Sequence, residues 1–435
     1  MTTISETYPT DVPVQRFKIT RKRVLALVLI AIAIGMLVLG NRSLTSDVVT
    51  TLTLVEPGTA TAIPAIEVPT LAYMNITALI FLAVGVLAIF NPPQIHRYVD
   101  GLLIFAGVIF IPTILIVAAA GNSTNITTMM AESLRLATPI AIGAIAGLWC
   151  ERSGVVNIAI EGMMLFGACF GFSTLFFLQD VFPPNQISIA MFLAVIVAVI
   201  AGGLAALLHA WLSITFATDQ IVSGTVINIL AVGVTSFWRR EFLLSNQGGI
   251  EKLPELPIPI LKDIPIVGDA LFSGQPIFYT MFFIIIISHI VLFYTRWGLR
   301  TRAVGEEPGA ADTLGINVNS MRWRNVLIGG MIAGLAGAWF SLEVTGTFSN
   351  GMTRGAGFIA LAALIFGKWT PFGAFAGALL FGFSDALGTR FQIIGVAVPV
   401  QFLQMVPYIV TIIVLAGLVG RSLAPKAVGE PYKKD

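Results

Sequence analysis

Long, nearly uninterrupted apolar runs are the feature that most constrains how this chain can fold. A helix that crosses the hydrocarbon core of a bilayer needs about 20 mostly apolar residues. Such runs lie near residues 24–40, 70–90, 101–120, 158–178, 189–216, 220–238, 277–295, 326–345, 371–388 and 400–419. They predict an all-α polytopic membrane protein with about 10–12 transmembrane helices, two of them short or broken.

The composition supports a lipid bilayer as the solvent of this chain. Charged residues make up 11% of the 435 residues, whereas soluble domains carry about 25%. So little charge cannot cover a surface that faces water. The net charge of +2 gives no indication of a nucleic-acid partner.

Cysteine and histidine usage gives no indication of a disulfide framework or a metal site. Cys150 and Cys169 lie in or beside apolar runs, where we expect small packing residues. His96, His209 and His289 are far apart and lack metal-ligand spacing. We therefore expect neither a bound metal nor a cofactor.

Two further apolar segments, 137–149 and 355–367, are too short to span comfortably. Each is followed by a polar break and a glycine-rich helix. Each segment can therefore either cross the bilayer fully or enter and leave it on the same side. The order of long helix, short segment, break and glycine-rich helix occurs at 101–178 and again at 326–388. An internal structural repeat and a chance alternation explain this recurring order about equally well.

The distribution of basic residues predicts the orientation. The first apolar run follows Arg16, Lys18, Arg21, Lys22 and Arg23 and is longer than a usual signal-peptide core, so we expect an uncleaved helix. A cytoplasmic N-terminus places most Lys and Arg residues inside, as the positive-inside rule requires. Both termini are then cytoplasmic, including the basic tail 421–435.

Glycines recur at four-residue spacing within several predicted helices. Small residues on one helix face let backbones approach closely in lipid. The pairs predict tight packing in a compact bundle: Gly167 and Gly171, Gly330 and Gly334, Gly373 and Gly377.

The longest predicted cytoplasmic connection is 296–325, in which arginines flank Glu306-Glu307-Pro308. Pro308 is typical of a helix start, and Ala310, Ala311 and Leu314 form a small apolar face that ends at Gly315. A short amphipathic surface helix suits docking into a groove on a partner protein. Composition alone favours the alternative, an ordinary charged loop.

This connection resembles the coupling helix of ABC transporter permeases that import branched-chain amino acids, ribose-type sugars and nucleosides. In that family the helix sits in a cleft of the ATPase subunit. Segments 151–164, 218–237 and 357–387 resemble the nucleoside-importing branch in particular. The resemblance implies ATPase coupling by Gly305, Glu306, Glu307, Pro308, Ala311, Gly315 and Ile316.

The resemblance implies a permease subunit that moves nucleosides, or related simple sugars, inward by alternating access. It implies an ABC ATPase subunit, a second homologous permease and an extracytoplasmic solute-binding (lipo)protein as partners. The location implied is a bacterial or archaeal cell membrane. The family core covers 101–420, with residues 1–100 forming an extra N-terminal unit with two helices and 421–435 a cytoplasmic tail.

The chain carries no ATP-binding loop of its own. A phosphate-binding loop needs glycine five residues before Gly-Lys and a hydroxyl residue after it, but Gly367-Lys368 has Ala362 and Trp369 at these positions. We therefore expect no enzyme activity, with ATP used by a partner subunit. The alternative is an ion-coupled secondary transporter, for which Glu161 is the candidate ion site.

Polar residues near the breaks are candidates for the substrate path. Asn157 and Glu161 follow the first short segment, and an ionisable group at membrane depth usually faces protein or water. Thr225 and Asn228, three residues apart, are predicted to pair on one helix face. Binding a nucleoside and bonding between helices are equally compatible with that pair.

Three other acidic residues have structural explanations. Glu151 and Arg152 are predicted to pair with each other at the cytoplasmic surface. Glu343 and Asp385, near the outer ends of their helices, are expected at the mouth or in packing.

Overall fold

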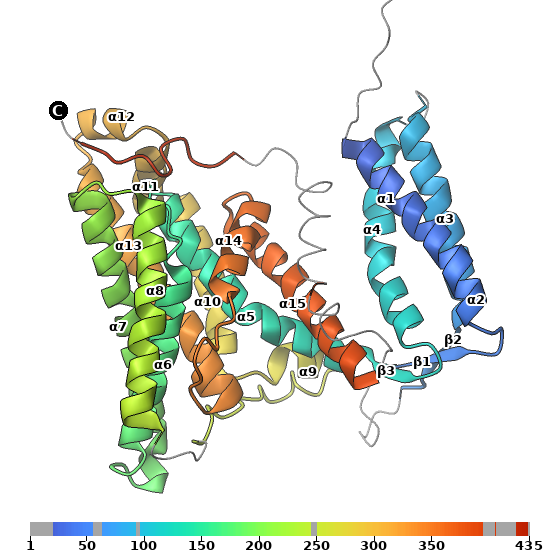
Figure 1. Ribbon diagram of the computed structural model, residues 1–435, viewed down its shortest axis with the longest axis horizontal. Helices are drawn as coiled ribbons and strands as arrows, with labels where there is room; N and C mark the ends of the chain where they lie inside the picture. The colour runs from blue at the N-terminus through green and yellow to red at the C-terminus, as the bar shows by residue number, and fades with distance from the viewer. Residues whose placement is uncertain are drawn as a thin grey trace, which may run out of the picture. The chain divides into compact units, whose positions relative to one another are not determined.

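The computed structural model describes residues 21–54, 63–92, 96–244, 250–394, 405 and 423–433, and the chain forms two compact units (Figure 1). The first unit comprises Met1–Val48 and Pro69–Val117, and the second comprises Val49–Val68 and Ala118–Asp435. The units therefore divide after Val117, one helix later than the expected boundary at residue 100.

The first unit is a small helical bundle. Its helices are α1 (Arg21–Gly35), extended by η1 (Met36–Gly40) and α2 (Asn41–Ser43), with α3 (Thr70–Phe90) and α4 (His96–Ala118). Ala33, Ala78 and Phe81 form its apolar centre. Lys22 on α1 forms a 2.8 Å ion pair with Asp100 on α4, so these two helices are joined by charge as well as by packing.

The second unit contains the other helices. Their bounds are α5 (Ile126–Glu151), α6 (Ile160–Leu178), η2 (Pro184–Gln186), α7 (Ile187–Ala210), η3 (Trp211–Thr215), α8 (Gln220–Trp238), η4 (Arg239–Leu243), α9 (Val267–Phe272), α10 (Pro276–Tyr294), α11 (Arg296–Glu306), α12 (Pro308–Thr313), α13 (Val318–Ala338), η5 (Trp339–Thr345), α14 (Ala356–Phe366) and α15 (Pro371–Ile394). The short π-helical stretches η3, η4 and η5 continue α7, α8 and α13 without a break.

A small sheet accompanies these helices. Strands β1 (Val49–Thr53), β2 (Ile66–Pro69) and β3 (Ser123–Asn125) are ordered β2-β1-β3. β1 pairs with β3 in parallel, with Thr51 opposite Ser123. The sheet thus ties the segment before α3 to the segment before α5.

Ten helices among the described residues are long and apolar enough to cross a membrane. They coincide with nine of the predicted runs and add α5, which confirms the all-α polytopic membrane fold. The predicted run at 400–419, apart from residue 405, lies outside the described residues.

The prediction that 137–149 is a short segment is wrong. It is the second half of α5, a helix of 26 residues. Ser133 ahead of it and Thr138 within it make the run less apolar without ending the helix, and their hydroxyls donate to carbonyls one turn back, at 2.7 and 3.0 Å. α14 is short as expected, with 11 residues. The two sets proposed as a repeat therefore differ in helix length, and the first is divided between the units.

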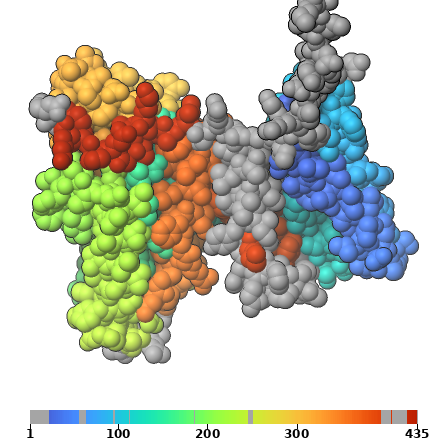
Figure 2. Space-filling view, turned by 45° about the horizontal axis from the view of Figure 1, so that its top comes forward, coloured from blue at the N-terminus to red at the C-terminus, as the bar shows by residue number. Residues whose placement is uncertain are grey.

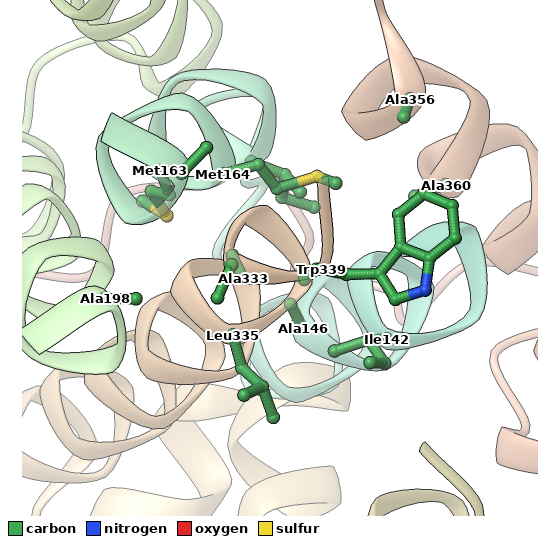
Figure 3. Packing of buried hydrophobic residues seen from close by; sticks show 14 of the residues in the cluster. Ile142, Ala146, Met163, Met164, Ala198, Ala333, Leu335, Trp339, Ala356 and Ala360 are labelled. Atoms are coloured by element: carbon green, nitrogen blue, oxygen red, sulfur yellow. The ribbon is translucent and has the colours of Figure 1, made fainter. Parts of the chain in front are cut away.

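Glycine contacts fasten α6, α7 and α13 together. A Cβ atom added to Gly167 of α6 would lie 2.7 Å from Gly334 Cα of α13, and one added to Gly202 of α7 would lie 2.6 Å from the same atom. Figure 3 shows Ala198 of α7 and Ala333 of α13 in the same packed region. The predicted tight glycine packing is confirmed here, and we call this contact the glycine seam.

Adding one methyl group to the seam should destabilise the protein. Gly167→Ala forces a Cβ against the α13 backbone, which costs about 1–3 kcal/mol and should lower Tm by about 1–3 °C for a chain of this length. Gly233→Ala on α8 is the matched control, because no atom lies within 4 Å of its added Cβ. Thermal unfolding in detergent measures both, and an equal Tm for the two variants would contradict the seam.

Candidate functional site

Residues 152–159, which we call the α5–α6 break, are held by side chains from α7 and α8. The Val156 N–H donates to Gln220 Oε1 at 2.7 Å. The Val156 carbonyl lies 2.9 Å from His209 Nε2, and His209 Nδ1 lies 3.1 Å from the Ser223 hydroxyl. Because a carbonyl can only accept, Nε2 carries the hydrogen and Nδ1 accepts from Ser223. Both peptide groups of Val156 are therefore satisfied without water.

Asn228 of α8 satisfies two more groups at the break. Its amide donates to the Ile158 carbonyl at 3.0 Å and accepts from the Gly162 N–H at 2.7 Å. The second bond serves one of the free N–H groups at the start of α6. Asn228 thus bridges the end of the break and the next helix.

The predicted pair of Thr225 and Asn228 does not form. The Thr225 side chain is exposed, and its hydroxyl donates to Ile221 in its own helix at 2.8 Å. A threonine hydroxyl on a helix readily bonds the carbonyl one turn back, whereas the longer Asn228 side chain reaches across to α6.

Asn157 is fully buried within the break. Its amide nitrogen lies 3.3 Å from Cys150 Sγ and 3.5 Å from Met163 Sδ. Its Oδ1 has no hydrogen-bond partner in the described part of the chain. An unpaired buried amide oxygen costs about 1–3 kcal/mol, which makes this the least satisfied point of the break.

Glu161, at the start of α6, caps the start of α14. Its Oε1 accepts from the Thr353 hydroxyl at 2.6 Å and from the Gly355 N–H at 2.9 Å, and its Oε2 accepts from the Gly357 N–H at 2.7 Å. A carboxylate is stabilised there because a helix N-terminus presents free N–H groups and positive potential. The first turns of α6 and α14 are thereby fastened to each other.

Glu343 plays a similar role in η5. Its side chain is buried, and Oε1 accepts from the Ile277 N–H at the start of α10. Asp385 is half-buried on α15. Glu343 is thus a packing residue, within the alternatives expected from the sequence.

The predicted pair of Glu151 and Arg152 is absent, because both side chains bind Trp369 instead. Glu151 Oε2 accepts from the Trp369 indole N–H at 2.5 Å. Arg152 donates to the Trp369 carbonyl from Nε at 2.9 Å and Nη2 at 2.6 Å. Trp369 has a left-handed backbone, with φ 52°, and connects the α5–α6 break to the turn between α14 and α15.

The electrostatics around Arg152 are unusual for a guanidinium. Burial lowers its pKa and the nearby positive charge of Arg302 lowers it further, whereas Glu306 raises it. Arg152 and Arg302 both lie over the Phe293 ring, at 5.5 and 5.1 Å from its centroid. The charges of Arg302 and Glu306 therefore act on the pKa of Arg152 in opposite directions.

The coupling segment, residues 296–316, consists of α11 and α12 joined at Glu307. Ala311 is 2% exposed and packs in a small cluster with Val304, Val318 and Met321. Leu314 is 81% exposed, and Gly315 has φ +81°. The predicted apolar face of Ala310, Ala311 and Leu314 is therefore wrong: Ala311 packs inward, while Ala310 and Leu314 face outward.

The coupling segment contacts the α5–α6 break directly. Gly305 lies against the Arg152 carbonyl, and a Cβ added to it would be 2.9 Å from the Arg152 carbonyl carbon and 3.3 Å from the Gly154 nitrogen. Only glycine permits this approach of two backbones. The backbones of α11 and of the break are therefore in direct contact, with no side chain between them.

An apolar pocket of about 400 Å³ lies among α6, α7 and α8. Its lining includes Phe166, Phe170, Leu204, Leu208 and Leu230. None of the four substrate-path candidates lines it. Within the described ranges, no group of three or more His, Cys, Asp or Glu side chains could hold a metal ion.

Comparison with known proteins defines the class of this multi-pass protein as a transporter permease. The family model described as "Branched-chain amino acid transport system / permease component" matches residues 129–415. The chain belongs to that family.

This chain matches nearly the whole length of several individual relatives. A guanosine ABC transporter permease protein, NupQ of Bacillus subtilis, is 42% identical over 71% of this chain and 97% of its own. A nucleoside ABC transporter permease protein, NupC of Lactococcus lactis, is 40% identical over 70% of this chain and 96% of its own. A putative glucose ABC transporter permease protein of Haloferax volcanii is 31% identical over 71% and 98%. No solved structure matches.

Neutralising Glu161 should loosen the junction of α6 and α14. In Glu161→Gln the amide nitrogen cannot accept from the Gly357 N–H, which leaves an unpaired donor and costs about 1–3 kcal/mol. Glu251→Gln removes the same charge from an exposed position and should have no such effect. Thermal unfolding of purified protein distinguishes them, and identical melting curves would contradict the capping role.

Proposed function

We propose that this chain is the permease subunit of an ATP-binding-cassette importer that moves nucleosides inward. The observation that carries the proposal is the 42% and 40% identity to the guanosine and nucleoside permeases, each matched over nearly its full length. The relative named for glucose is 31% identical. Nucleosides are therefore preferred to simple sugars.

The proposed mechanism is alternating access powered by a separate ATPase subunit. In this proposal the exposed Leu314 and Gly315 seat in a groove of the ATPase, while Ala311 anchors α12 to its own subunit. Closure of the ATPase displaces α11, and the contact of Gly305 with Arg152 carries the displacement to the α5–α6 break. The packing of these backbones supports that route. Trp369 extends it to α14 and α15.

The polar residues at the break have distinct places in this mechanism. Glu161 and Asn228 hold the ends of the interrupted helices and so shape the proposed solute path. Asn157 carries an unpaired oxygen that gains a partner when the break rearranges. Thr225 faces outward from α8 and is assigned to that outer surface rather than to the path.

The proposed assembly has two ATPase subunits, a second homologous permease and an extracytoplasmic solute-binding lipoprotein. Both termini are proposed to be cytoplasmic. The described end of the C-terminal tail lies beside the coupling segment (Figure 1). This neighbourhood supports a cytoplasmic C-terminus, because the ATPase is proposed to dock at the coupling segment. The setting is the cell membrane of a bacterium or archaeon.

An ion-coupled secondary transporter is the second candidate, with Glu161 as its ion site. Glu161 accepts three hydrogen bonds from protein donors, which leaves it committed to the start of α14. That geometry favours a structural carboxylate over an ion-coupling one.

Transport measurements distinguish the two mechanisms. Vesicles that contain the complete complex should accumulate labelled nucleoside only when ATP is supplied. Uptake by the permease alone, driven by a proton or sodium gradient, would establish the second candidate instead.

The backbone of Gly315 provides a sharper test of coupling. Gly315→Trp places a bulky side chain in a left-handed conformation that costs about 1–2 kcal/mol and obstructs the proposed groove. Nucleoside-stimulated ATP hydrolysis should be lost while the permease remains inserted. Gly315→Asn is the control, because asparagine tolerates this conformation. Normal stimulation in the tryptophan variant would show that the coupling segment is not the docking element.

A further inference from the structure

Residues 423–433 lie against the coupling segment, and we call them the C-terminal strap. Figure 1 shows them beside α11 and α12, and Figure 2 shows them running across that surface in red. Pro425 is buried and Ala427 is 3% exposed, whereas the neighbouring Lys426 side chain is exposed. The strap is therefore docked through its small apolar side chains.

One set of contacts joins the strap to the coupling segment. The Ala427 N–H donates to the Gly305 carbonyl at 2.9 Å. The Lys426 backbone N–H donates to Glu306 Oε2 at 3.3 Å. Tyr432 packs against the cluster around Ala311, so both α11 and α12 are engaged.

A second set joins the same strap to the break and to α13. The Gly429 N–H donates to the Gly154 carbonyl at 3.2 Å. Arg322 of α13, 1% exposed, donates from Nη1 to the Glu430 carbonyl at 2.8 Å. Gly154 has φ +89°, and a Cβ there would lie 2.8 Å from Arg322 Nη2.

These contacts lie on both sides of the joint between Gly305 and Arg152. The joint itself is a small backbone contact, and Glu307, two residues further on, has the non-helical backbone that separates α11 from α12. A load applied to α12 would tend to separate the joint. Hydrogen bonds from Ala427 to Gly305 and from Gly429 to Gly154 resist that separation, because the two partners cannot move apart without breaking one of them.

We propose that the C-terminal strap is a positioning element that keeps the coupling segment against the α5–α6 break during the ATPase stroke. This inference rests on the proposed function, since it assigns a role within coupling. Without the strap, ATPase closure moves α12 but the movement reaches the break incompletely, and ATP is hydrolysed with little transport.

Docking of the strap can be tested without reference to transport. In the complete complex, Ala427→Cys should react with a water-soluble maleimide at least about tenfold more slowly than Lys426→Cys, because its labelling requires local opening. The native Cys150 and Cys169 are buried and give a low background. Equal labelling rates would overturn the docked strap.

The role of the strap is tested by the number of nucleosides transported per ATP hydrolysed. Ala427→Leu and a chain ended at Ser422 should lose several-fold in this ratio while still hydrolysing ATP, whereas Lys426→Leu should keep it. An unchanged ratio overturns the proposal, and so does a raised one, which would make the strap a brake. If Gly315→Trp keeps normal stimulation, the proposed coupling fails, while the labelling result still reports on docking.

Discussion

Hydrocarbon offers no hydrogen-bond partner, and that constraint bears on the described interruption between α5 and α6 and on the start of α14. A peptide group freed within the bilayer must find its partner inside the chain. Here Gln220, His209 and Asn228 supply partners for the α5–α6 break, and Glu161 supplies them for the start of α14. The interrupted helices therefore depend on packing against α7 and α8 for their stability. Any rearrangement of the break must replace these hydrogen bonds with others.

The coupling segment contacts this same break. Buried polar side chains of α7 and α8 hold the break, and it also meets Gly305 and the strap through backbone contacts. Short backbone contacts transmit displacement better than long side chains, which can change rotamer under load. Trp369 adds a second rigid link from Glu151 and Arg152 to α14 and α15.

Apolar run length predicted most helices of the fold, because the bilayer sets a minimum length that irregular segments cannot meet. It failed for α5, where Ser133 and Thr138 lower the hydropathy but bond to their own helix. The candidate site was less predictable. His209 carried no sequence signal, because its partners lie 14 and 53 residues away. Thr225 faces outward and Ala311 faces inward. Both orientations depend on packing between helices, which helical periodicity alone does not specify.

The glycine seam limits which parts of the molecule can move relative to each other. Helices in contact through backbone alone have no side chains to re-pack, so sliding α6, α7 and α13 past one another would produce collisions at once. We therefore expect these three helices to move together as one rigid group. In the proposed alternating access, the gating movements then fall to the helices that border the seam.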